Sequence, residues 1–305
     1  MRPKEQAEMR VMVLGASADQ GVPLVRALRA AGHDVTAGAR RADAMAGTPF
    51  PSLPTVHADI GDSASLAAAF AGQDALAFHL PFEFDRARAA AYGQAIGTAA
   101  KAAGIRDIVF NTACFVADHD LDLSAHDGRR DIEAALQASG ARCCFVEPVV
   151  FMDNMIRVWS RPSIAQRGIF AYPAAPTLRI NWVCLGDVAA AMVAALEQSD
   201  APLHLPLGGP ETLVGDQVAE RLSEALGRPI RFLSLAPDEF AASMSELVTG
   251  SREVQPHSIY DGMAKFYRWY NDQPVSPLIV DPAPAARLGL TPTPLVEWAK
   301  RQDWS

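Results

Sequence analysis

A glycine-spaced segment near the start of the chain carries residue types suited to binding phosphate. Its members are Gly15, Ser17, Ala18, Gln20 and Gly21. Glycine lets a backbone approach a phosphate closely, and the free N–H groups of a helix N-terminus favour its negative charge. Ala18 takes the middle position of a G-x-x-G-x-x-G pattern, and its methyl group narrows that approach. The segment predicts a dinucleotide-binding turn, the alternative being a turn whose site is vacant or weakened.

Two adjacent arginines, Arg40 and Arg41, follow an apolar run at 34–39, and the next carboxylate is Asp43. In a βαβ dinucleotide site, an acidic residue at this place binds the ribose 2′-hydroxyl of NAD, whereas arginine accommodates the 2′-phosphate of NADP. A guanidinium attracts that phosphate and can hold it through two parallel hydrogen bonds. We therefore expect NADP(H) to be preferred over NAD(H), the alternative being a solvated loop that binds no ligand.

Two histidines and an arginine are candidates for contact with the reacting part of the nucleotide. His79 ends an apolar run that Pro81 stops, and we expect the backbone there to contact the cofactor, the alternative being simple packing. His126 lies one helical turn before Arg129, and its imidazole is the best candidate proton donor, the alternative being a surface histidine. Arg129 does not titrate near neutral pH, so it can hold a phosphate or orient a ribose without acting as an acid.

Alternating strands and helices must position these residues. Apolar runs predict strands at 10–14, 34–39, 55–58, 74–80, 107–112, 142–147, 180–184 and 230–235. Helical patterns cover 22–31, 63–70, 86–103, 129–139, 187–197, 214–226, 237–244 and 295–300, while 245–280 is aromatic and irregular. Near-continuous apolar strands between helices indicate a parallel sheet covered on both faces. We therefore expect an α/β fold, a doubly wound parallel sheet of the Rossmann type with a smaller C-terminal α/β substrate lobe.

The domain boundaries are placed where this alternation becomes irregular. Residues 9–153 form the expected dinucleotide-binding core, which residues from about 180 to 200 complete. Residues 154–179 and 201–305 form the smaller substrate lobe, over the sheet edge where ligands bind in such folds. Phe151 and Asn154 are the expected substrate-binding residues, at the mouth of that lobe. The aromatic group at 266–270 either packs within the lobe or lines a pocket for a planar substrate.

Composition excludes several other classes of protein. The chain has 305 residues, half of them hydrophobic, and a net charge of −8 without a long basic run, so we expect no direct nucleic-acid contact. No apolar run reaches transmembrane length, and the polar first eight residues lack a signal-peptide core, so we expect a cytoplasmic protein without membrane contact. Four cysteines without a C-x-x-C pair indicate reduced thiols. The histidines, cysteines and acidic residues do not show the spacing of metal ligands, so we expect no metal site.

By these residues the chain resembles the NmrA-like family of atypical short-chain dehydrogenase/reductases. The matching segments are Val13-Leu-Gly-Ala-Ser17, Ala58-Asp59, Ala99-Ala-Lys-Ala-Ala-Gly104, Ile132-Glu133, Glu147-Pro148, Phe151-Met-Asp-Asn154, Gly186-Asp-Val-Ala189 and Gly208-Gly-Pro-Glu211. The resemblance spans roughly residues 10 to 240 and implies a Rossmann core that binds NAD(P). It also implies that Asp59 lies near the adenine, the alternative being a turn former.

The resemblance leaves the activity open, because the family includes reductases of quinones, azo dyes and phenylpropanoids and also nucleotide-sensing regulators. The Tyr-x-x-x-Lys pair of typical short-chain dehydrogenases is missing, and the usual serine position falls on Ala113, beside Thr112. Thr112, His126 and Arg129 remain the catalytic candidates, with Thr112 also a cofactor contact. We expect an NADPH-dependent reductase of a small quinone or carbonyl-type substrate. The alternative is an NADP(H)-sensing regulator that controls a partner protein, and a homodimer is compatible with either function.

Overall fold

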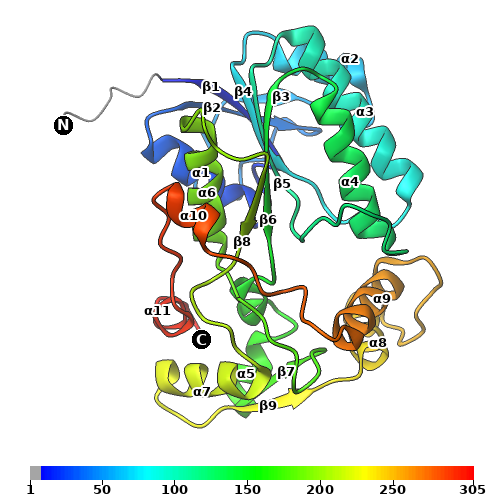
Figure 1. Cartoon of the computed structure of the whole chain (residues 1–305), viewed down its shortest axis with the longest axis vertical. Helices are drawn as coiled ribbons and strands as arrows, with labels where there is room; N and C mark the ends of the chain where they lie inside the picture. The colour runs from blue at the N-terminus through cyan, green and yellow to red at the C-terminus, as the bar shows by residue number, and fades with distance from the viewer. Residues whose placement is uncertain (1–7) are drawn as a thin grey trace.

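A seven-stranded parallel sheet forms the centre of the computed structural model, which describes residues 8–305 (Figure 1). Its strands are β1 (Arg10–Leu14), β2 (Asp34–Ala39), β3 (Thr55–His57), β4 (Ala75–His79), β5 (Asp107–Asn111), β6 (Arg142–Pro148) and β8 (His204–Leu207). They lie in the order β3-β2-β1-β4-β5-β6-β8, so the direction of winding reverses between β1 and β4. The predicted doubly wound α/β fold is confirmed, and a crevice for ligands is expected at that reversal.

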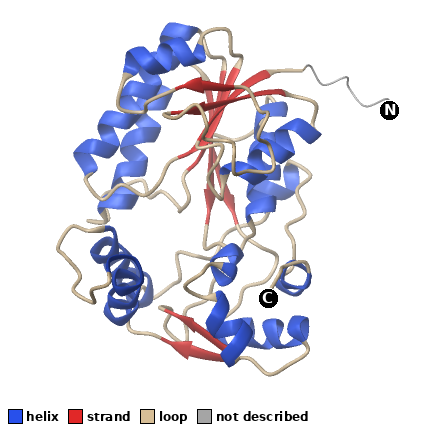
Figure 2. Cartoon of the chain, turned by 180° about the vertical axis from the view of Figure 1, so that it is seen from behind, coloured by secondary structure: helices blue, strands red, loops and turns tan. Residues whose placement is uncertain are grey.

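Helices cover both faces of this sheet (Figures 1 and 2). One face carries α1 (Gly21–Ala30) and α6 (Leu185–Glu197), and the other carries α2 (Ser63–Phe70), α3 (Arg86–Ala103) and α4 (Ser124–Gln137). Helices α3 and α4 pack closely because α3 presents glycines: a Cβ at Gly97 would lie 2.5 Å from the carbonyl oxygen of Ala135. This close packing fixes α4, which carries several candidate site residues, against the sheet.

The smaller lobe lies beyond the carboxyl ends of the strands (Figure 1). Its parallel pair is β7 (Ile169–Tyr172) and β9 (Arg231–Ser234). The remaining elements of the second half are the 3-10 helix η1 (Met152–Ile156), α5 (Arg161–Arg167), α7 (Gly215–Leu226), α8 (Pro237–Thr249), α9 (Ile259–Asp272), α10 (Ala283–Arg287) and α11 (Leu295–Lys300). The lobe is α/β, as the sequence predicts.

Three expectations from the sequence are wrong in detail. Strand β8 extends the main sheet, although residues 201–305 are expected to belong to the lobe. The segment 180–184 makes isolated bridges to Phe151 and Leu213 rather than a strand, and the Asn181 side chain bonds the 209–212 turn. Helix α9 lies within the segment expected to be irregular.

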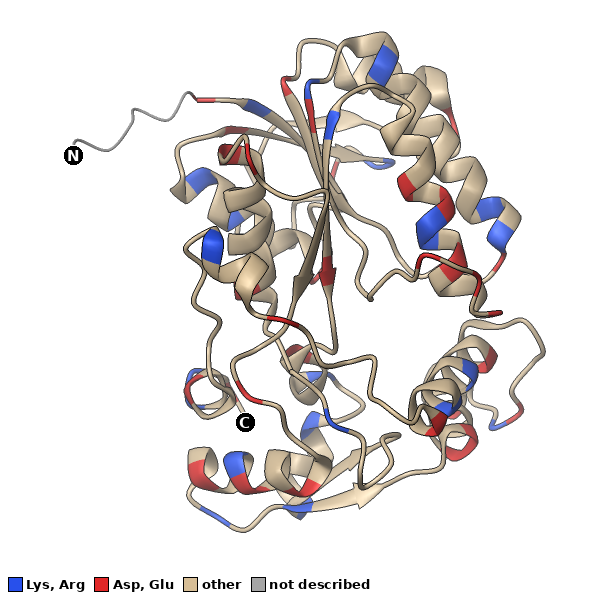
Figure 3. Cartoon of the chain, viewed as in Figure 1, with Lys and Arg blue, Asp and Glu red and all other residues tan. Residues whose placement is uncertain are grey.

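The distribution of charge agrees with a sheet buried on both faces. Charged residues lie mainly on the outer helices and loops, and the strands carry few of them (Figure 3). Strand β4 is buried at all five positions, which agrees with the apolar residues that precede His79 in it. The four cysteines are buried and unpaired. Across residues 8–305, no helix combines the length and the hydropathy that crossing a bilayer requires.

Candidate functional site

The glycine-spaced turn lies between β1 and α1, at the carboxyl edge of the sheet. Gly15 has a φ of +75°, and a Cβ there would lie 2.8 Å from Cε1 of His79. A Cβ at Gly21 would lie 2.0 Å from the carbonyl oxygen of Gly15, so the turn closes only on glycine. The N–H groups of Ser17, Asp19 and Gln20 find no acceptor within residues 8–305. The turn therefore offers free donors to an anion, as a phosphate site requires.

A cavity of about 870 Å³ opens in front of this turn. The predicted residues that line it are Gly15, Ser17, Ala18, Gln20, Arg40, Arg41, Asp59, His79, Pro81, Arg129, Phe151 and Asn154. Gly21 lies behind the lining and shapes the turn from there. The structure thus brings residues from six separate parts of the chain to one crevice, at the reversal of the strand order.

Basic residues form one end of this larger cavity. Arg40 and Arg41 are exposed, and Arg41 bonds Asp43 at 3.1 Å. Arg40 makes no ion pair with any other described residue, which leaves its guanidinium available. Asp59 accepts a hydrogen bond from the N–H of Gly61 at 2.9 Å, so its carboxylate shapes a turn in the cavity wall.

Arg129, on α4, holds the β4–α3 connection at the other end of the cavity. Its Nη2 donates to the carbonyl oxygens of Leu80 at 2.7 Å and Pro81 at 3.0 Å. The guanidinium also lies 5.1 Å from the ring centroid of Phe82. Burial lowers the pKa of Arg129, and its Nε has no hydrogen-bond partner among the described residues. His79 is buried beside it, and burial together with the arginine lowers the pKa of His79 to about 4.

A smaller cavity of about 250 Å³ adjoins the larger one. Aromatic side chains form most of its wall: Phe82, Phe151, Trp159, Tyr172, Phe240, Phe266, Tyr267 and Tyr270. None of its lining residues is charged. The hydroxyl oxygens of Tyr172 and Tyr267 lie 2.5 Å apart. Nδ2 of Asn154 lies 3.5 Å from the hydroxyl oxygen of Tyr172. Burial raises the pKa of both tyrosines, to about 12 for Tyr172, so they are neutral donors.

The two cavities meet at residues that line both: Gln20, Phe82, Phe151 and Asn154. The Asn111 side chain braces this junction, since its Nδ2 donates to Oε1 of Gln20 and its Oδ1 accepts from the N–H of Ala113, both at 2.8 Å. Ala113 has a φ of +60°, an unfavourable conformation for alanine that this hydrogen bond helps to hold. A ligand in either cavity would contact the same wall.

Two expected catalytic residues do not reach either cavity. The Thr112 hydroxyl is fully buried and donates to the carbonyl oxygens of Cys114 at 2.6 Å and Val146 at 3.0 Å. Nε2 of His126 bonds the hydroxyl of Tyr270 at 2.6 Å, behind the cavity wall. Burial lowers the pKa of His126 to about 3, so the ring is neutral at pH 7. Both side chains support the wall, and neither is placed to contact substrate.

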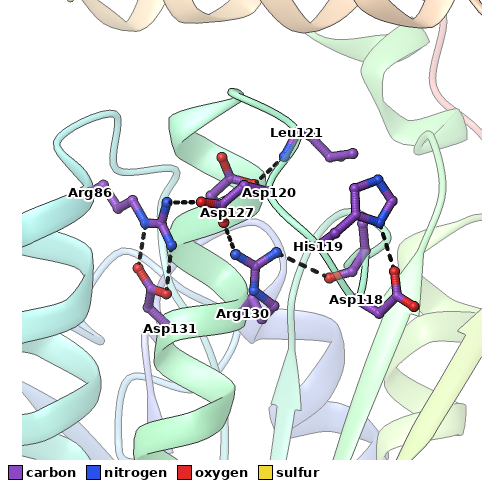
Figure 4. Close-up of polar contacts among 9 residues, drawn as sticks. Arg86, Asp118, His119, Asp120, Leu121, Asp127, Arg130 and Asp131 are labelled. Atoms are coloured by element: carbon purple, nitrogen blue, oxygen red, sulfur yellow. Dashed lines mark hydrogen bonds and ion pairs between the residues drawn. The ribbon is translucent and has the colours of Figure 1, made fainter.

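The segment 115–123 packs against the lobe and is held by an ion-pair network (Figure 4). Arg86 of α3 bonds Asp131 through two nitrogens, at 2.7 and 3.0 Å, and Asp120 at 3.0 Å. Arg130 also bonds Asp120, and Asp127 accepts from the N–H of Leu121 at 2.9 Å. Each exposed pair contributes little, but together they fix the segment that carries Phe115 against α9.

Two features of the site are not predicted from the sequence. Nη1 of Arg157 bonds Oδ2 of Asp19 at 2.5 Å, so the start of the lobe is tied to the glycine turn across the larger cavity. The other is that the aromatic group at 266–270, for which a pocket wall is one of the two expectations, lies on a helix, α9, which supplies Phe266, Tyr267 and Tyr270 to the smaller cavity. Their spacing, on one face of a helix, is the signal that could have identified the helix.

Comparisons with known proteins agree with this geometry. The NmrA-like family model matches residues 7–299. An NAD(P)H azoreductase from Xenophilus azovorans is 28% identical over 262 residues, which are 84% of this chain and 86% of that protein. A (4-alkanoyl-5-oxo-2,5-dihydrofuran-3-yl)methyl phosphate reductase from Streptomyces griseus is 33% identical over 235 residues, which are 75% of this chain and 78% of that protein.

Among solved structures, the NADPH-dependent quinone oxidoreductase of Escherichia coli in complex with NADPH superposes with a TM-score of 0.76 at 21% identity. The match covers 95% of this chain and 98% of that one, and at this identity it shows the shared fold. The family model, by contrast, spans almost the whole described structure, from the glycine turn through the lobe. The chain therefore belongs to the NmrA-like family.

Proposed function

We propose that the protein is an NADPH-dependent reductase that transfers hydride to a small, planar quinone or carbonyl-type acceptor. The observation that carries this proposal is the junction of the two cavities, where Gln20, Phe82, Phe151 and Asn154 line both. A nucleotide in the larger cavity and an acceptor in the smaller one would share this wall. The two reductases among the relatives support an oxidoreductase of the same general class.

The residues of the larger cavity fit a dinucleotide. The free N–H groups of Ser17, Asp19 and Gln20 would hold the pyrophosphate, and Arg40 would bind the 2′-phosphate. Gly15 lets the backbone pass directly against the His79 ring, which leaves the space in front of the turn open. Bound NADPH supplies the hydride, while the protein supplies orientation and electrostatic stabilisation.

The smaller cavity suits a flat, uncharged acceptor. Its aromatic walls favour stacking, and a charged acceptor would lose hydration without gaining an ionic partner. In the pair Tyr172 and Tyr267, one hydroxyl donates to the other, and the second hydroxyl would donate to the acceptor oxygen on which negative charge develops. Quinone reduction needs little acid assistance, because the phenolate formed is a stable anion. This agrees with a site whose nearby histidine, His79, is neutral and buried.

The proposal is tested by NADPH oxidation across a panel of quinones and aldehydes, with a pocket-filling variant. Met263→Trp narrows the smaller cavity, and Leu247→Trp on the exposed face of α8 is the matched control. We expect Met263→Trp to lower kcat/KM for the acceptor at least tenfold with the Kd of NADPH within twofold, and Leu247→Trp to change neither. The reductase proposal fails if wild-type protein binds NADPH but none of the acceptors in the panel supports NADPH oxidation. A nucleotide-sensing regulator then becomes the better account.

A further inference from the structure

Three side chains with metal-binding groups meet at the outer edge of the main sheet. They are Glu133 on α4, Glu147 on β6 and His204 at the start of β8. One potential ligand atom of each lies within 4.8 Å of the other two. None of the three lines either cavity, so the cluster is separate from the proposed reaction site and does not depend on the proposed function.

The geometry of this cluster is held by contacts around it. Nδ1 of His204 lies 2.7 Å from Oε1 of Glu147 and 4.0 Å from Oε2 of Glu133. The second oxygen of Glu147 accepts from the N–H of Val116 at 3.0 Å, which orients the carboxylate. The His204 ring packs against Phe145, with centroids 5.5 Å apart. Such outer contacts are typical of side chains that are held ready to bind a metal.

Both glutamates are buried, and neither forms an ion pair with a lysine or arginine among residues 8–305. Glu133 is 2% exposed, and its Oε1 has no hydrogen-bond partner among residues 8–305. No lysine or arginine of the described chain pairs with Glu133 or Glu147. The nearby Arg129 donates its hydrogen bonds to the carbonyl oxygens of Leu80 and Pro81, and Arg130 donates to Asp120. Buried carboxylates are normally paired or bound to a metal, so this cluster has room for one more positive charge.

We propose that Glu133, Glu147 and His204 bind one divalent transition-metal ion, with Zn²⁺ the best fit. Zinc accepts imidazole and carboxylate ligands together, whereas Mg²⁺ and Ca²⁺ favour oxygen-only sites. Donors ~2.1 Å from zinc lie ~3.4 Å apart in a tetrahedron. To bind the ion, Nδ1 of His204 must therefore move away from Oε1 of Glu147, now at 2.7 Å, and toward Oε2 of Glu133, now at 4.0 Å. The His204 side chain is 46% exposed and can make this movement, and the open side admits a water as fourth ligand.

A metal here would join α4 to the last two strands of the sheet, β6 and β8. Strand β8 has only four residues and forms the sheet edge, so it gains most from an added cross-link. Helix α4 carries Arg129 one turn before Glu133, and β6 leads into the shared cavity wall. The site is therefore structural, supporting the reaction site from outside.

The test is calorimetric titration of untagged, chelator-treated protein with Zn²⁺, with Mg²⁺ and Ca²⁺ as comparison ions. We expect one Zn²⁺ per chain, no saturable binding of the other ions, and a Tm rise of about 5 °C at a hundredfold excess over Kd. His204→Gln and Glu133→Gln should each weaken Zn²⁺ binding at least tenfold. The control is His119→Gln, an exposed histidine outside the cluster, which should bind as wild type does.

Two results would overturn the proposal. One is the absence of saturable Zn²⁺ binding by the wild-type chain, which would mean that the buried pair is neutralised by a proton instead. The other is Zn²⁺ binding that survives His204→Gln unchanged, which would locate the ion elsewhere. Because the His204 side chain is half exposed, this variant is expected to fold even if Glu133→Gln does not.

Discussion

Replacing Arg40 by alanine tests how the larger cavity would distinguish NADPH from NADH. Arg40 is exposed, lines the cavity and makes no ion pair with another described residue, so no competing contact must be broken before it binds a phosphate. A hydrogen bond to a charged group contributes about 1.5–3 kcal/mol. Exposure to water places this contact near the lower end, at about 1.5–2 kcal/mol, which is a 10- to 30-fold change in Kd.

The neighbouring arginine gives a graded comparison. Arg41 already bonds Asp43 at 3.1 Å, and that carboxylate repels a phosphate, so Arg41→Ala should weaken NADPH binding less than Arg40→Ala. Calorimetric titration should show NADH binding within twofold of wild type in both variants. Arg167→Ala, at the end of α5 and outside both cavities, is the control. If Arg40→Ala weakened the binding of NADPH and of NADH by the same factor, the assignment of Arg40 to the 2′-phosphate would be refuted.

The remaining predictions concern the turn, the buried histidines and the helix packing. Gly21→Ala places a Cβ 2.0 Å from the Gly15 carbonyl oxygen, so calorimetry should show NADPH binding weakened at least a hundredfold, whereas Gly47→Ala, in open space, should bind normally. His79 and His126 have pKa values of about 4 and 3 when folded, below their unfolded value of about 6.5, so the unfolded chain takes up protons first and stability falls as the pH drops below 6.5. At pH 5 each histidine should lower the free energy of unfolding by about 2 kcal/mol. Urea unfolding of His126→Gln should therefore show a smaller decrease in the free energy of unfolding between pH 7.5 and 5 than wild type does, and an equal decrease would contradict the burial argument. Gly97→Ala should lower the free energy of unfolding by about 1–3 kcal/mol, because its Cβ would lie 2.5 Å from the Ala135 carbonyl oxygen, and a Tm equal to wild type would show that α3 and α4 can separate freely.

Local sequence is sufficient to predict the nucleotide half of the site. The strand, turn and helix around Gly15 and Gly21 are contiguous, so their types and spacing fix the geometry directly. The helix at 86–103 and its left-handed end at Gly104 follow from the same kind of signal. Parallel strands then bring Arg40 and Asp59 to the same cavity, because their carboxyl ends meet at one edge.

The reaction half depends on contacts between distant segments. Thr112 directs its hydroxyl to Val146 on β6, and His126 is covered in part by Tyr270, 144 residues later in the chain. Strand β8 contains Pro206, which argues against a strand unless it lies at a sheet edge, as it does here. The cluster of Glu133, Glu147 and His204 shows no spacing typical of metal ligands along the sequence, because each residue comes from a different element.

The central claim is that the larger cavity binds NADPH. It is tested most directly by calorimetric titration of the unmodified chain with NADPH, NADP⁺, NADH and NAD⁺. We predict one NADPH per chain, with NADH bound at least tenfold more weakly. Binding of none of the four nucleotides would contradict the account, because the free N–H groups of the turn and Arg40 would then have no phosphate to hold, and Ala18 would mark a site that has lost its ligand.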